Sequence, residues 1–338
     1  MAQVGIGVVG LGRMGRVYAF HTARQIEGAA LVAVADPSPQ ARAEFSAQFP
    51  DVQAYGDYRD LLNDPRIQGV IVASPTSTHR DVVIAAAQAD KAIFCEKPLA
   101  LTLEETDAIA AAVQKAGVPL QVGFMRRFDA GYAAAKAKID AGVIGRPVTI
   151  RSIGRDPHRT SLEFADPAVS GGLIVDMAIH DFDSMRWLMG DEVQRVYTEV
   201  AALVYPELLE VGDVDNAMIN LRFEGGGLGN VEVSRTAIYG YDIRCTVVGT
   251  KGTLEIGYLR QTPILVLNEA GVTHDVVPHF PQRFGKAYTT QIEHFVTSLV
   301  NEQPPAVTLE DARAALQICL AATRSQHEGR VVYVRDVN

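Results

Sequence analysis

Cysteine is scarce in this chain of 338 residues: Cys95, Cys245 and Cys319 are the only three, and none form a C-x-x-C pair. This spacing argues against a disulfide framework and against a zinc ribbon. The eight histidines include no H-E-x-x-H motif, and neither a G-x-S-x-G elbow nor a Walker loop occurs. No metal site is therefore expected, and serine hydrolysis and phosphoryl transfer are disfavoured.

Positive charge is also in short supply. The chain has 31 Lys and Arg against 40 Asp and Glu, a net charge of −9, and its basic residues are scattered. This pattern argues against nucleic acid and anionic membrane as partners. No apolar run reaches the roughly 18 residues of a transmembrane helix, and the opening MAQVGIGVVG lacks a charged segment and a cleavage pattern. A cytoplasmic protein is expected.

The length predicts two domains. In residues 1–124 short apolar runs alternate with helical patterns, which is typical of a parallel sheet covered by helices on both faces. The expected strands are VGIGVVG, LVAVAD, GVIVAS, AIFCEK and LQVGF, and the expected helices lie at about 13–26, 39–48, 78–89 and 103–116. The sequence therefore predicts an α/β fold that begins with a doubly wound parallel sheet of the Rossmann type.

After Phe124 the pattern changes. A helix is expected at about 128–141, then the strand VTIRSIGR, and residues 192–277 are strand-rich, with two hairpins around glycine-rich turns. Helices at about 283–301 and 308–326 and the strand VVYVRD close the chain. Residues 125–338 are thus expected to form an α+β domain on a large, open, mainly antiparallel sheet. Its last helix and strand are candidates to pack back on the first domain.

The first strand leads into a glycine loop. GIGVVGLGRMGRVYA places Gly10, Gly12 and Gly15 in the spacing G-x-G-x-x-G between a strand and a helix. One glycine allows a tight turn, one lets the backbone approach a pyrophosphate, and one lets helix and strand pack closely. The alternative is a glycine-rich turn that serves packing alone. The context of strand and helix favours dinucleotide binding.

Asp36, at the end of the second strand, indicates which dinucleotide. Its carboxylate can accept hydrogen bonds from ribose hydroxyls, and its charge repels a 2′-phosphate. Pro37 and Ser38 offer no arginine to hold such a phosphate, so NAD is expected rather than NADP. Arg13 can contact the pyrophosphate or adenine, or it can be a solvated first-turn arginine.

A second unusual segment is GGLIVDMAIHDFDSMRWLMG, residues 171–190. As a helix it is apolar nearly all round, so it should be buried. Asp176, His180 and Asp183 nevertheless follow at i, i+4 and i+7, on one stripe. Buried ionisable groups are costly unless they are paired or functional. Asp176 and His180 are either an internally satisfied pair or catalytic groups, whereas Asp183 is expected to be structural, bonded to backbone or to an arginine such as Arg186.

Lys97 ends a strand in the segment FCEKPLA, at the sheet edge where doubly wound folds bind ligands. SPTSTH precedes this segment, and VGFMRRFD, DPHR and GGLIVDMAIHDFD follow it in that order. With these motifs the chain resembles the family of glucose-fructose oxidoreductase, inositol dehydrogenase and MocA over essentially its whole length. GFMRRFD, DMAIHDFD and YGYDIRCTVVGTKG look most like inositol 2-dehydrogenases. TSLEF after DPHR departs from the pattern and leaves the substrate contacts of that loop open.

The resemblance implies a catalytic set of Lys97, Asp176 and His180, and a peptide bond before Pro98 that can be cis. With the glycine loop included, cofactor contacts are expected from Gly10, Gly12, Arg13, Met14, Gly15, Asp36, Ser74, Pro75, His79, Glu96, Lys97 and Arg126. Substrate contacts are expected from Lys97, Met125, Arg127, Asp156, His158, Asp176, His180 and Tyr239. Whether Tyr239 or Tyr241 faces the substrate stays open.

The expected reaction is NAD-dependent oxidation of a cyclic polyol, above all myo-inositol to its 2-keto product. His180 would be the base, Asp176 would orient it, and Lys97 would stabilise the developing alkoxide. The alternatives are scyllo-inositol, an aldose or another sugar as substrate, an enzyme that keeps its NAD bound, and a non-catalytic NAD-binding regulator. The resemblance also implies a homo-oligomer, a dimer or a tetramer, formed through the sheet of the second domain.

Overall fold

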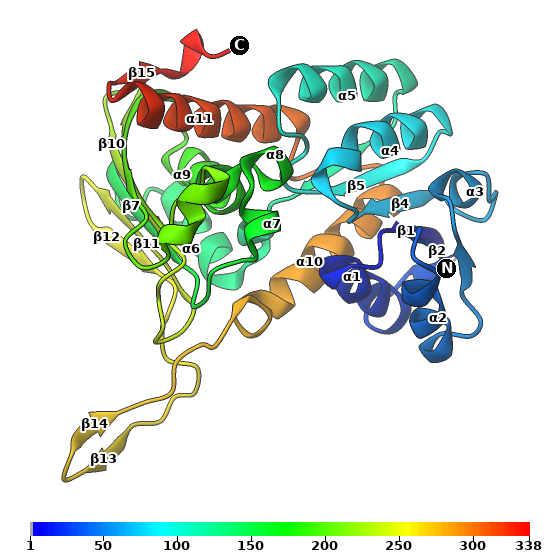
Figure 1. Cartoon of the computed structure of the whole chain (residues 1–338), viewed down its shortest axis with the longest axis horizontal. Helices are drawn as coiled ribbons and strands as arrows, with labels where there is room; N and C mark the ends of the chain where they lie inside the picture. Colours follow the sequence, from blue (N-terminus) through cyan, green and yellow to red (C-terminus); the bar gives the residue numbers. More distant parts are fainter. Residues whose placement is uncertain (1–2) are drawn as a thin grey trace. The chain divides into compact units, whose positions relative to one another are not determined.

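The structure is a computed structural model that describes residues 3–338 (Figure 1). It consists of two compact units. The first runs up to Met125 and also contains Lys286–Arg313, and the second comprises Arg126–Gly285 and Ala314–Asn338. The predicted division into 1–124 and 125–338 is simpler than this one, because a segment near the end of the chain belongs to the first unit.

The first unit contains a six-stranded parallel sheet in the order β3-β2-β1-β4-β5-β6 (Figure 1). The strands are β1 (Val4–Val9), β2 (Ala29–Ala35), β3 (Gln53–Tyr55), β4 (Gly69–Val72), β5 (Ala92–Glu96) and β6 (Leu120–Gly123). The helices are α1 (Arg13–Arg24), α2 (Pro39–Gln48), α3 (Tyr58–Leu62), α4 (Thr76–Gln88) and α5 (Leu103–Ala116). The predicted doubly wound parallel sheet is confirmed. Its strand order reverses direction between β1 and β4, where such folds bind ligands.

Helix α10 (Phe280–Val300) explains why a late segment joins the first unit. From Lys286 onward it is part of that unit, and the ring of Phe295 lies 6.0 Å from that of Phe94 on β5. A Cβ atom on Gly69 of β4 would lie 3.4 Å from the Phe295 ring and 3.3 Å from Leu299. The helix therefore buries its apolar face on the parallel sheet, which local sequence patterns do not show.

The second unit contains a seven-stranded sheet in the order β12-β11-β7-β10-β9-β8-β15. β10 and β7 pair in parallel and the other neighbours are antiparallel, so the predicted mainly antiparallel sheet is confirmed, as are the hairpins β9–β10 and β11–β12. The strands are β7 (Pro147–Arg155), β8 (Val193–Ala201), β9 (Asn216–Phe223), β10 (Leu228–Ser234), β11 (Asp242–Gly249), β12 (Thr253–Ile256) and β15 (Val332–Tyr333).

The end of the chain is divided between the two units. The last strand, β15, belongs to the second unit, where it pairs with β8, with Val332 opposite Val196, and extends the second sheet. Most of helix α11 (Leu309–Glu328) also belongs to the second unit. Pairing at this edge satisfies backbone groups of β8 that would otherwise be exposed.

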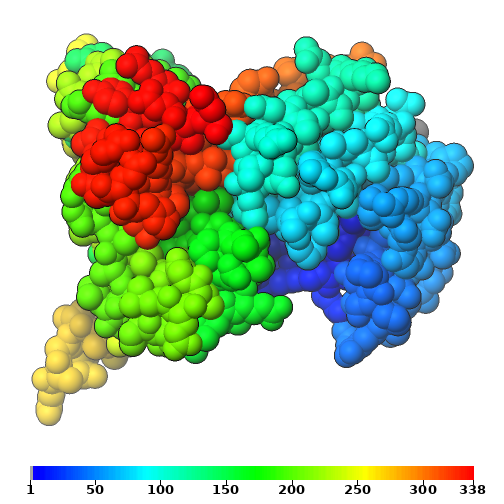
Figure 2. All heavy atoms as spheres, turned by 45° about the horizontal axis from the view of Figure 1, so that its top comes forward, coloured from blue at the N-terminus to red at the C-terminus, as the bar shows by residue number. Residues whose placement is uncertain are grey.

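Shorter elements complete the second unit. They are η1 (Met125–Phe128), which begins on the last residue of the first unit, α6 (Ala130–Asp140), α7 (Leu162–Ala165), α8 (Pro167–Ser170), η2 (Ile174–Ala178), α9 (Ile179–Met189), η3 (Pro206–Val211), β13 (Val266–Asn268), β14 (Gly271–Thr273) and η4 (Val334–Asp336). The β13–β14 hairpin stands away from the rest of this unit (Figures 1 and 2). Over residues 3–338, none of the helices combines the length and the apolar character that a bilayer-spanning segment needs.

Candidate active site

The three glycines of the loop after β1 have different surroundings. These surroundings agree with the three roles predicted for them: a tight turn, open backbone beside a pyrophosphate, and close packing of helix and strand. Gly10 has a φ of +94°, and a Cβ there would lie 2.7 Å from the backbone of Ser74. A Cβ on Gly15 would lie 1.8 Å from the carbonyl oxygen of Gly10, so only glycine lets α1 pack this closely. A Cβ on Gly12 would meet nothing within 4 Å. The space beside Gly12, at the N-terminus of α1, is therefore open to a phosphate.

Asp36 faces this loop from the end of β2. One carboxylate oxygen accepts the N–H of Leu11 at 2.7 Å and the other accepts the N–H of Ser38 at 2.8 Å. These bonds hold the carboxylate against the glycine loop, where the sequence predicts the adenosine ribose. Arg42, which no sequence motif indicated, donates from its guanidinium to the carbonyls of Asp36 at 2.6 Å and of Pro37 at 3.0 Å.

A cavity of about 500 Å³ opens beside Asp36, entirely within the first unit. Its lining comprises Val9, Gly10, Ala35, Asp36, Pro37, Gly56, Asp57, Tyr58, Arg59, Ser74, Pro75, Thr78 and Val82. Gly10, Asp36, Ser74 and Pro75 were predicted cofactor contacts. The cavity is of the size that small-molecule sites have, and one wall carries the acceptor that a ribose needs. The residues present thus fit the adenosine half of NAD.

His79 on α4 connects two loops of the first unit. Its Nδ1 lies 2.9 Å from the carbonyl oxygen of Pro98 and its Nε2 lies 2.9 Å from that of Ser74. Burial lowers the pKa of His79 and outweighs the two carbonyl contacts, which raise it. The peptide bond between Lys97 and Pro98 is cis, as the resemblance implies. His79 therefore fixes the loop that carries Lys97, and its predicted contact with a cofactor stays a prediction.

Glu96 lies beneath the same loop. Its carboxylate accepts the hydroxyl of Tyr18 and, at 3.1 Å, the backbone N–H of Lys97. Gln291 on α10 donates to the Tyr18 oxygen at 2.7 Å. Burial raises the pKa of Glu96, although the bond from Tyr18 and the charge of Lys97 lower it. The carboxylate is so tightly enclosed that a Cβ on Gly123 would lie 3.1 Å from it. Glu96 thus holds the backbone of Lys97 in place.

In the second unit, the segment that carries Asp176 differs from the single helix expected. Residues Ile174–Ala178 form a π-helical turn, and α9 begins only at Ile179. Asp176 lies in the wider turn and His180 in the first turn of α9, so the even i, i+4 stripe is wrong at this point. π-turns of this kind occur frequently at functional sites. Asp176 accepts a hydrogen bond from the buried Arg235 at 3.2 Å, a partner the sequence did not indicate.

Two carboxylates on α9 bind arginines for which the sequence predicted contacts with the cofactor and the substrate. Arg126 donates to Asp181 at 2.5 Å, and Arg127 donates to Asp183 at 2.5 and 3.0 Å. Asp183 is therefore structural, as predicted, but its partner is not Arg186, which instead binds Glu192. Both pairs are buried. Contacts of Arg126 with a cofactor and of Arg127 with a substrate stay predictions.

The remaining predicted substrate residues lie near strand ends of the second unit, except the buried Met125, which ends the first stretch of the first unit. Asp156 follows β7 and donates its backbone N–H to Ser234 at 2.8 Å, and His158 is exposed two residues later. The two tyrosines differ. Tyr241 is buried beside His279 and Phe284, whereas Tyr239 is 44% exposed.

The Tyr239 hydroxyl is held at both sides. It accepts a hydrogen bond from Arg155 at 2.9 Å and donates one to Asp242 at 2.9 Å. Its exposure makes Tyr239 the better candidate of the two tyrosines for a substrate contact.

Within residues 3–338, no group of three or more His, Cys, Asp or Glu side chains gathers as a metal site would require.

Comparison with known proteins agrees with this geometry. Residues 4–124 match the profile of the oxidoreductase family's NAD-binding Rossmann fold, GFO_IDH_MocA, and residues 136–334 match the profile of its C-terminal alpha/beta domain. The chain belongs to this oxidoreductase family. The family resemblance and the NAD-binding domain expected from the sequence are thereby confirmed.

Relatives match along almost the whole chain. The scyllo-inositol 2-dehydrogenase (NAD(+)) of Bacillus subtilis is 42% identical over 98% of this chain and 96% of its own length. The myo-inositol 2-dehydrogenase of Thermotoga maritima is 38% identical over 98% and 99%. A crystal structure of scyllo-inositol dehydrogenase from Lactobacillus casei with bound NAD(H) and scyllo-inositol superposes with a TM-score of 0.94, 31% identity and coverage of 98% and 99%.

Proposed function

We propose that this protein is an NAD-dependent dehydrogenase that oxidises a ring hydroxyl of an inositol, with myo-inositol giving its 2-keto product. The observation that carries the proposal is a cavity fitted to adenosine and an open glycine loop beside it, in a chain whose relatives over nearly its full length are inositol 2-dehydrogenases. When bound, NAD supplies the acceptor for the hydride of the carbinol carbon.

In the proposed reaction the chain's own residues handle the proton. His180 takes the hydroxyl proton, because an imidazole is an effective base near neutrality. Asp176 orients the imidazole and stabilises its charged form. Lys97 donates a hydrogen bond to the oxygen and stabilises the negative charge that develops on it. The backbone bond from Lys97 to Glu96 supports this role, since it fixes the loop from which the ammonium group projects.

The proposed cofactor contacts are based on the local geometry of the glycine loop and of Asp36. The pyrophosphate is proposed to lie beside Gly12 and the first turn of α1, with Arg13 and Met14 next to it, and the adenosine ribose beside Asp36. The negative charge of Asp36 disfavours the 2′-phosphate of NADP. Tyr58 and Arg59, whose guanidinium lies 4.6 Å from the Tyr58 ring centre, extend the cavity wall where adenine would lie.

A second candidate substrate is scyllo-inositol. The Bacillus subtilis relative that is named for this isomer is 42% identical, against 38% for the myo-inositol relative from Thermotoga maritima. The two isomers differ only in the orientation of one hydroxyl, a difference that pocket geometry resolves. An aldose is a weaker candidate, because both of these relatives are named for inositols.

The deciding experiment follows NADH absorbance with purified protein, NAD or NADP, and myo-inositol, scyllo-inositol, glucose or xylose. The variants His180→Ala and Lys97→Ala are measured beside the wild type. Turnover of an inositol with NAD that is lost in both variants supports the proposal. Binding of NAD without reduction by any of the polyols would contradict it, and would favour an enzyme that retains its NAD or a regulator.

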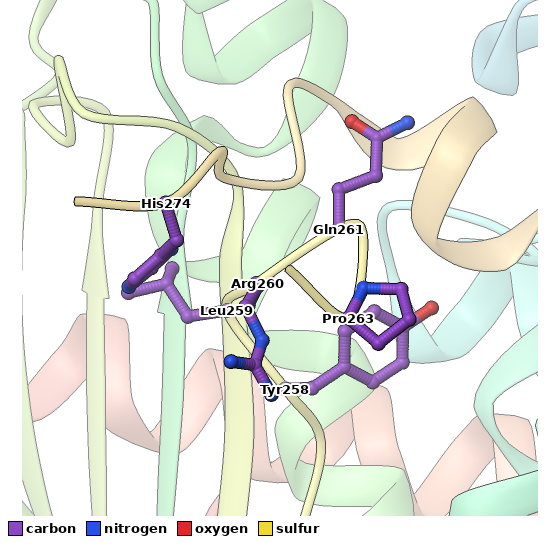
Figure 3. A pocket seen from close by; sticks show the side chains of 6 residues that line it. All are labelled: Tyr258, Leu259, Arg260, Gln261, Pro263 and His274. Atoms are coloured by element: carbon purple, nitrogen blue, oxygen red, sulfur yellow. The ribbon is translucent and has the colours of Figure 1, made fainter. Parts of the chain in front are cut away.

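We also propose a homo-oligomer, a tetramer formed through the sheet of the second unit and extended by the β13–β14 hairpin. The hairpin exposes apolar side chains, with Leu267 73% and Val272 61% exposed. Beside its base lies a hollow of about 440 Å³ (Figure 3), lined by Tyr258, Leu259, Arg260, Gln261, Pro263 and His274. A second copy of the chain is the proposed occupant, since matched hairpins can bury these surfaces reciprocally about a twofold axis. We further propose a cytoplasmic location, because the proposed reaction draws on the cell's NAD pool.

A further inference from the structure

The bulkiest of the fully buried side chains within residues 3–338 carries a charge. Arg235 follows the last residue of β10 and is only 1% exposed. An arginine stays protonated under all physiological conditions, so its burial requires partners. The proposed reaction uses no residue of β10, and the sequence motifs gave no reason to select Arg235.

Two carboxylates share this one guanidinium. Nη1 of Arg235 donates to Asp213 at 2.7 Å, and Nη2 donates to Asp176 at 3.2 Å. The flat, forked guanidinium can address two acceptors in fixed directions, which the single ammonium of a lysine does less well. Asp213 is buried, whereas the side chain of Asp176 remains 23% exposed. Asp213, Arg235 and Asp176 thus form a triad in which the Asp213 carboxylate is enclosed and the Asp176 carboxylate remains accessible.

Two members of this group, Arg235 and Asp213, are also bonded to the backbone. The backbone N–H of Arg235 donates to the carbonyl of Asp215 at 3.0 Å. The second oxygen of Asp213 accepts the N–H of Leu173 at 2.8 Å, directly before the π-helical turn that carries Asp176. A Cβ on Gly172, whose φ is +70°, would lie 2.9 Å from that same oxygen. Arg235 is thus connected to the segment of Asp176 in two ways: by its direct bond to the Asp176 carboxylate, and through Asp213, which binds both Arg235 and the backbone of Leu173.

We propose that Arg235 is a positioning residue for the dehydrogenase reaction: it fixes the direction of the Asp176 carboxylate and keeps it ionised, so that Asp176 can orient His180. This inference rests on the proposed function. One cation between two carboxylates leaves a single net negative charge, which is enough to stabilise an imidazolium. Without the cation, the buried carboxylate of Asp213 and the partly exposed carboxylate of Asp176 would face each other, and their mutual repulsion would favour uptake of a proton.

The charged and titratable groups around Asp176 in its own unit come from several elements. Arg235 follows β10, Asp213 precedes β9, and His180 lies on α9. From α11 the thiol of Cys319 contacts the carbonyl of Ile174, and His327 borders the small cavity that Asp213 also lines. Glu232 on β10 is bound by Arg151 and Arg155. Among these groups, Arg235 donates a hydrogen bond directly to Asp176.

Three variants separate geometry from charge. Arg235→Lys keeps the charge and removes the fork, Arg235→Met removes both, and Asp213→Asn removes the opposing negative charge. Arg324→Met, an exposed arginine paired with Glu328 on α11, is the matched control. For each variant, kcat, the KM for NAD and for inositol, the pH profile of kcat/KM, and the thermal midpoint are measured.

We expect kcat to fall about 10- to 100-fold in Arg235→Lys and Arg235→Met, with the KM for NAD unchanged because the cofactor cavity lies in the first unit. The acid limb of the pH profile should move up in Arg235→Met, because loss of a positive charge favours proton binding by the Asp176 and His180 pair. It should move down in Asp213→Asn, where a negative charge is lost, and stay near the wild-type position in Arg235→Lys.

Opposite shifts of the limb in Arg235→Met and Asp213→Asn would establish the role, since general damage would not produce both signs. A folded Arg235→Met with the kcat and pH profile of the wild type would overturn the inference while leaving the proposed function intact. A wild type that reduces no NAD with any inositol would overturn both. If Arg235→Met does not fold, Arg235→Lys and Asp213→Asn decide, and unchanged kcat and limb in these two would count against the inference.

Discussion

The hydroxyl of Tyr18 donates a hydrogen bond to the carboxylate of Glu96, the residue directly before Lys97. Tyr18 lies on α1 behind the glycine loop, so this bond joins the helix at the phosphate end of the cofactor site to the loop of the proposed catalytic lysine. Burial raises the pKa of both groups. The pair therefore links α1 to the Lys97 loop, two parts of the first unit whose relative position matters for the proposed reaction.

Replacing Tyr18 with Phe tests this coupling. The ring and its packing against Phe94 remain, but Glu96 loses a donor and Gln291 loses an acceptor. Leaving buried polar groups without partners costs about 1–3 kcal/mol, so the thermal midpoint should fall. We expect kcat to drop roughly tenfold while NAD affinity, measured by fluorescence quenching, stays the same. A kcat equal to that of the wild type would mean that Lys97 does not depend on this bond.

Local patterns allowed much of the fold to be predicted. Apolar runs of four to seven residues gave the strands of the parallel sheet except β3, and glycine-rich turns gave the hairpins β9–β10 and β11–β12. β3 and α3 were missed because three and five residues carry too little periodicity to detect. The return of α10 to the first unit was missed because it depends on tertiary packing around Gly69, not on a local signal.

The candidate site was predictable only where the chain motif itself dictates geometry. The glycine loop, Asp36 and the Lys97 turn are local features, and the structure shows the backbone geometry expected of them, whereas their contacts with cofactor and substrate stay predictions. Partners of buried charges are different. Asp183 binds Arg127, which is 56 residues away in sequence, and not the nearby Arg186. Arg235 is 59 residues away from Asp176, and an isolated arginine after a strand gives no signal of burial.

Asp36 is expected to determine cofactor choice. Asp36→Asn keeps an acceptor for one of the two backbone donors, Leu11 and Ser38, but removes the charge. We expect kcat/KM for NAD to fall by about 10- to 100-fold, since the ribose loses an ionised acceptor, and kcat/KM for NADP to rise from its wild-type value. Asp36→Glu retains the charge and is the matched control for NADP exclusion. Unchanged discrimination in Asp36→Asn would place specificity elsewhere.

Acid stability should depend on Asp64. Its carboxylate accepts hydrogen bonds from the guanidinium of Arg66 at 2.6 and 3.0 Å, and these bonds lower its pKa from 3.8 to about 2, despite the opposing effect of burial. A depressed folded-state pKa stabilises the fold above the ordinary value, and this contribution is lost as the pH falls through the folded-state value. Asp64→Asn should therefore lower the thermal midpoint at pH 7, with the difference from wild type shrinking toward about pH 2.

The guanidinium of Arg66 is largely exposed, so the effect should be modest and should weaken in high salt. Melting curves of both proteins between neutral and acid pH, at low and high ionic strength, measure it. A difference in thermal midpoint that stays constant with pH would show that Asp64 acts through its shape and not through its charge.

The β13–β14 hairpin should control assembly. In Leu267→Asp/Val272→Asp two exposed apolar side chains become charged, so a contact that buries them in a second copy should be disfavoured. Sedimentation velocity is expected to show a smaller species or a concentration-dependent one, where the wild type stays assembled. Glu269→Lys, which changes charge at the hairpin turn without touching the apolar residues, is the control. An unchanged sedimentation coefficient in the double variant would assign assembly to the sheet alone.

Gly12 and Gly15 should respond in opposite ways to the same substitution. In Gly12→Ala the added methyl group meets no protein atom within 4 Å and the φ of −68° suits alanine, so the thermal midpoint should not fall. The methyl group would occupy the space proposed for the pyrophosphate, and NAD affinity should weaken at least about tenfold. In Gly15→Ala the methyl group would lie 1.8 Å from the Gly10 carbonyl, so α1 must move away from β1 and the fold itself should lose stability. Thermal melts and NAD titrations of both variants separate these effects. If Gly12→Ala bound NAD as tightly as the wild type, the pyrophosphate could not lie beside Gly12.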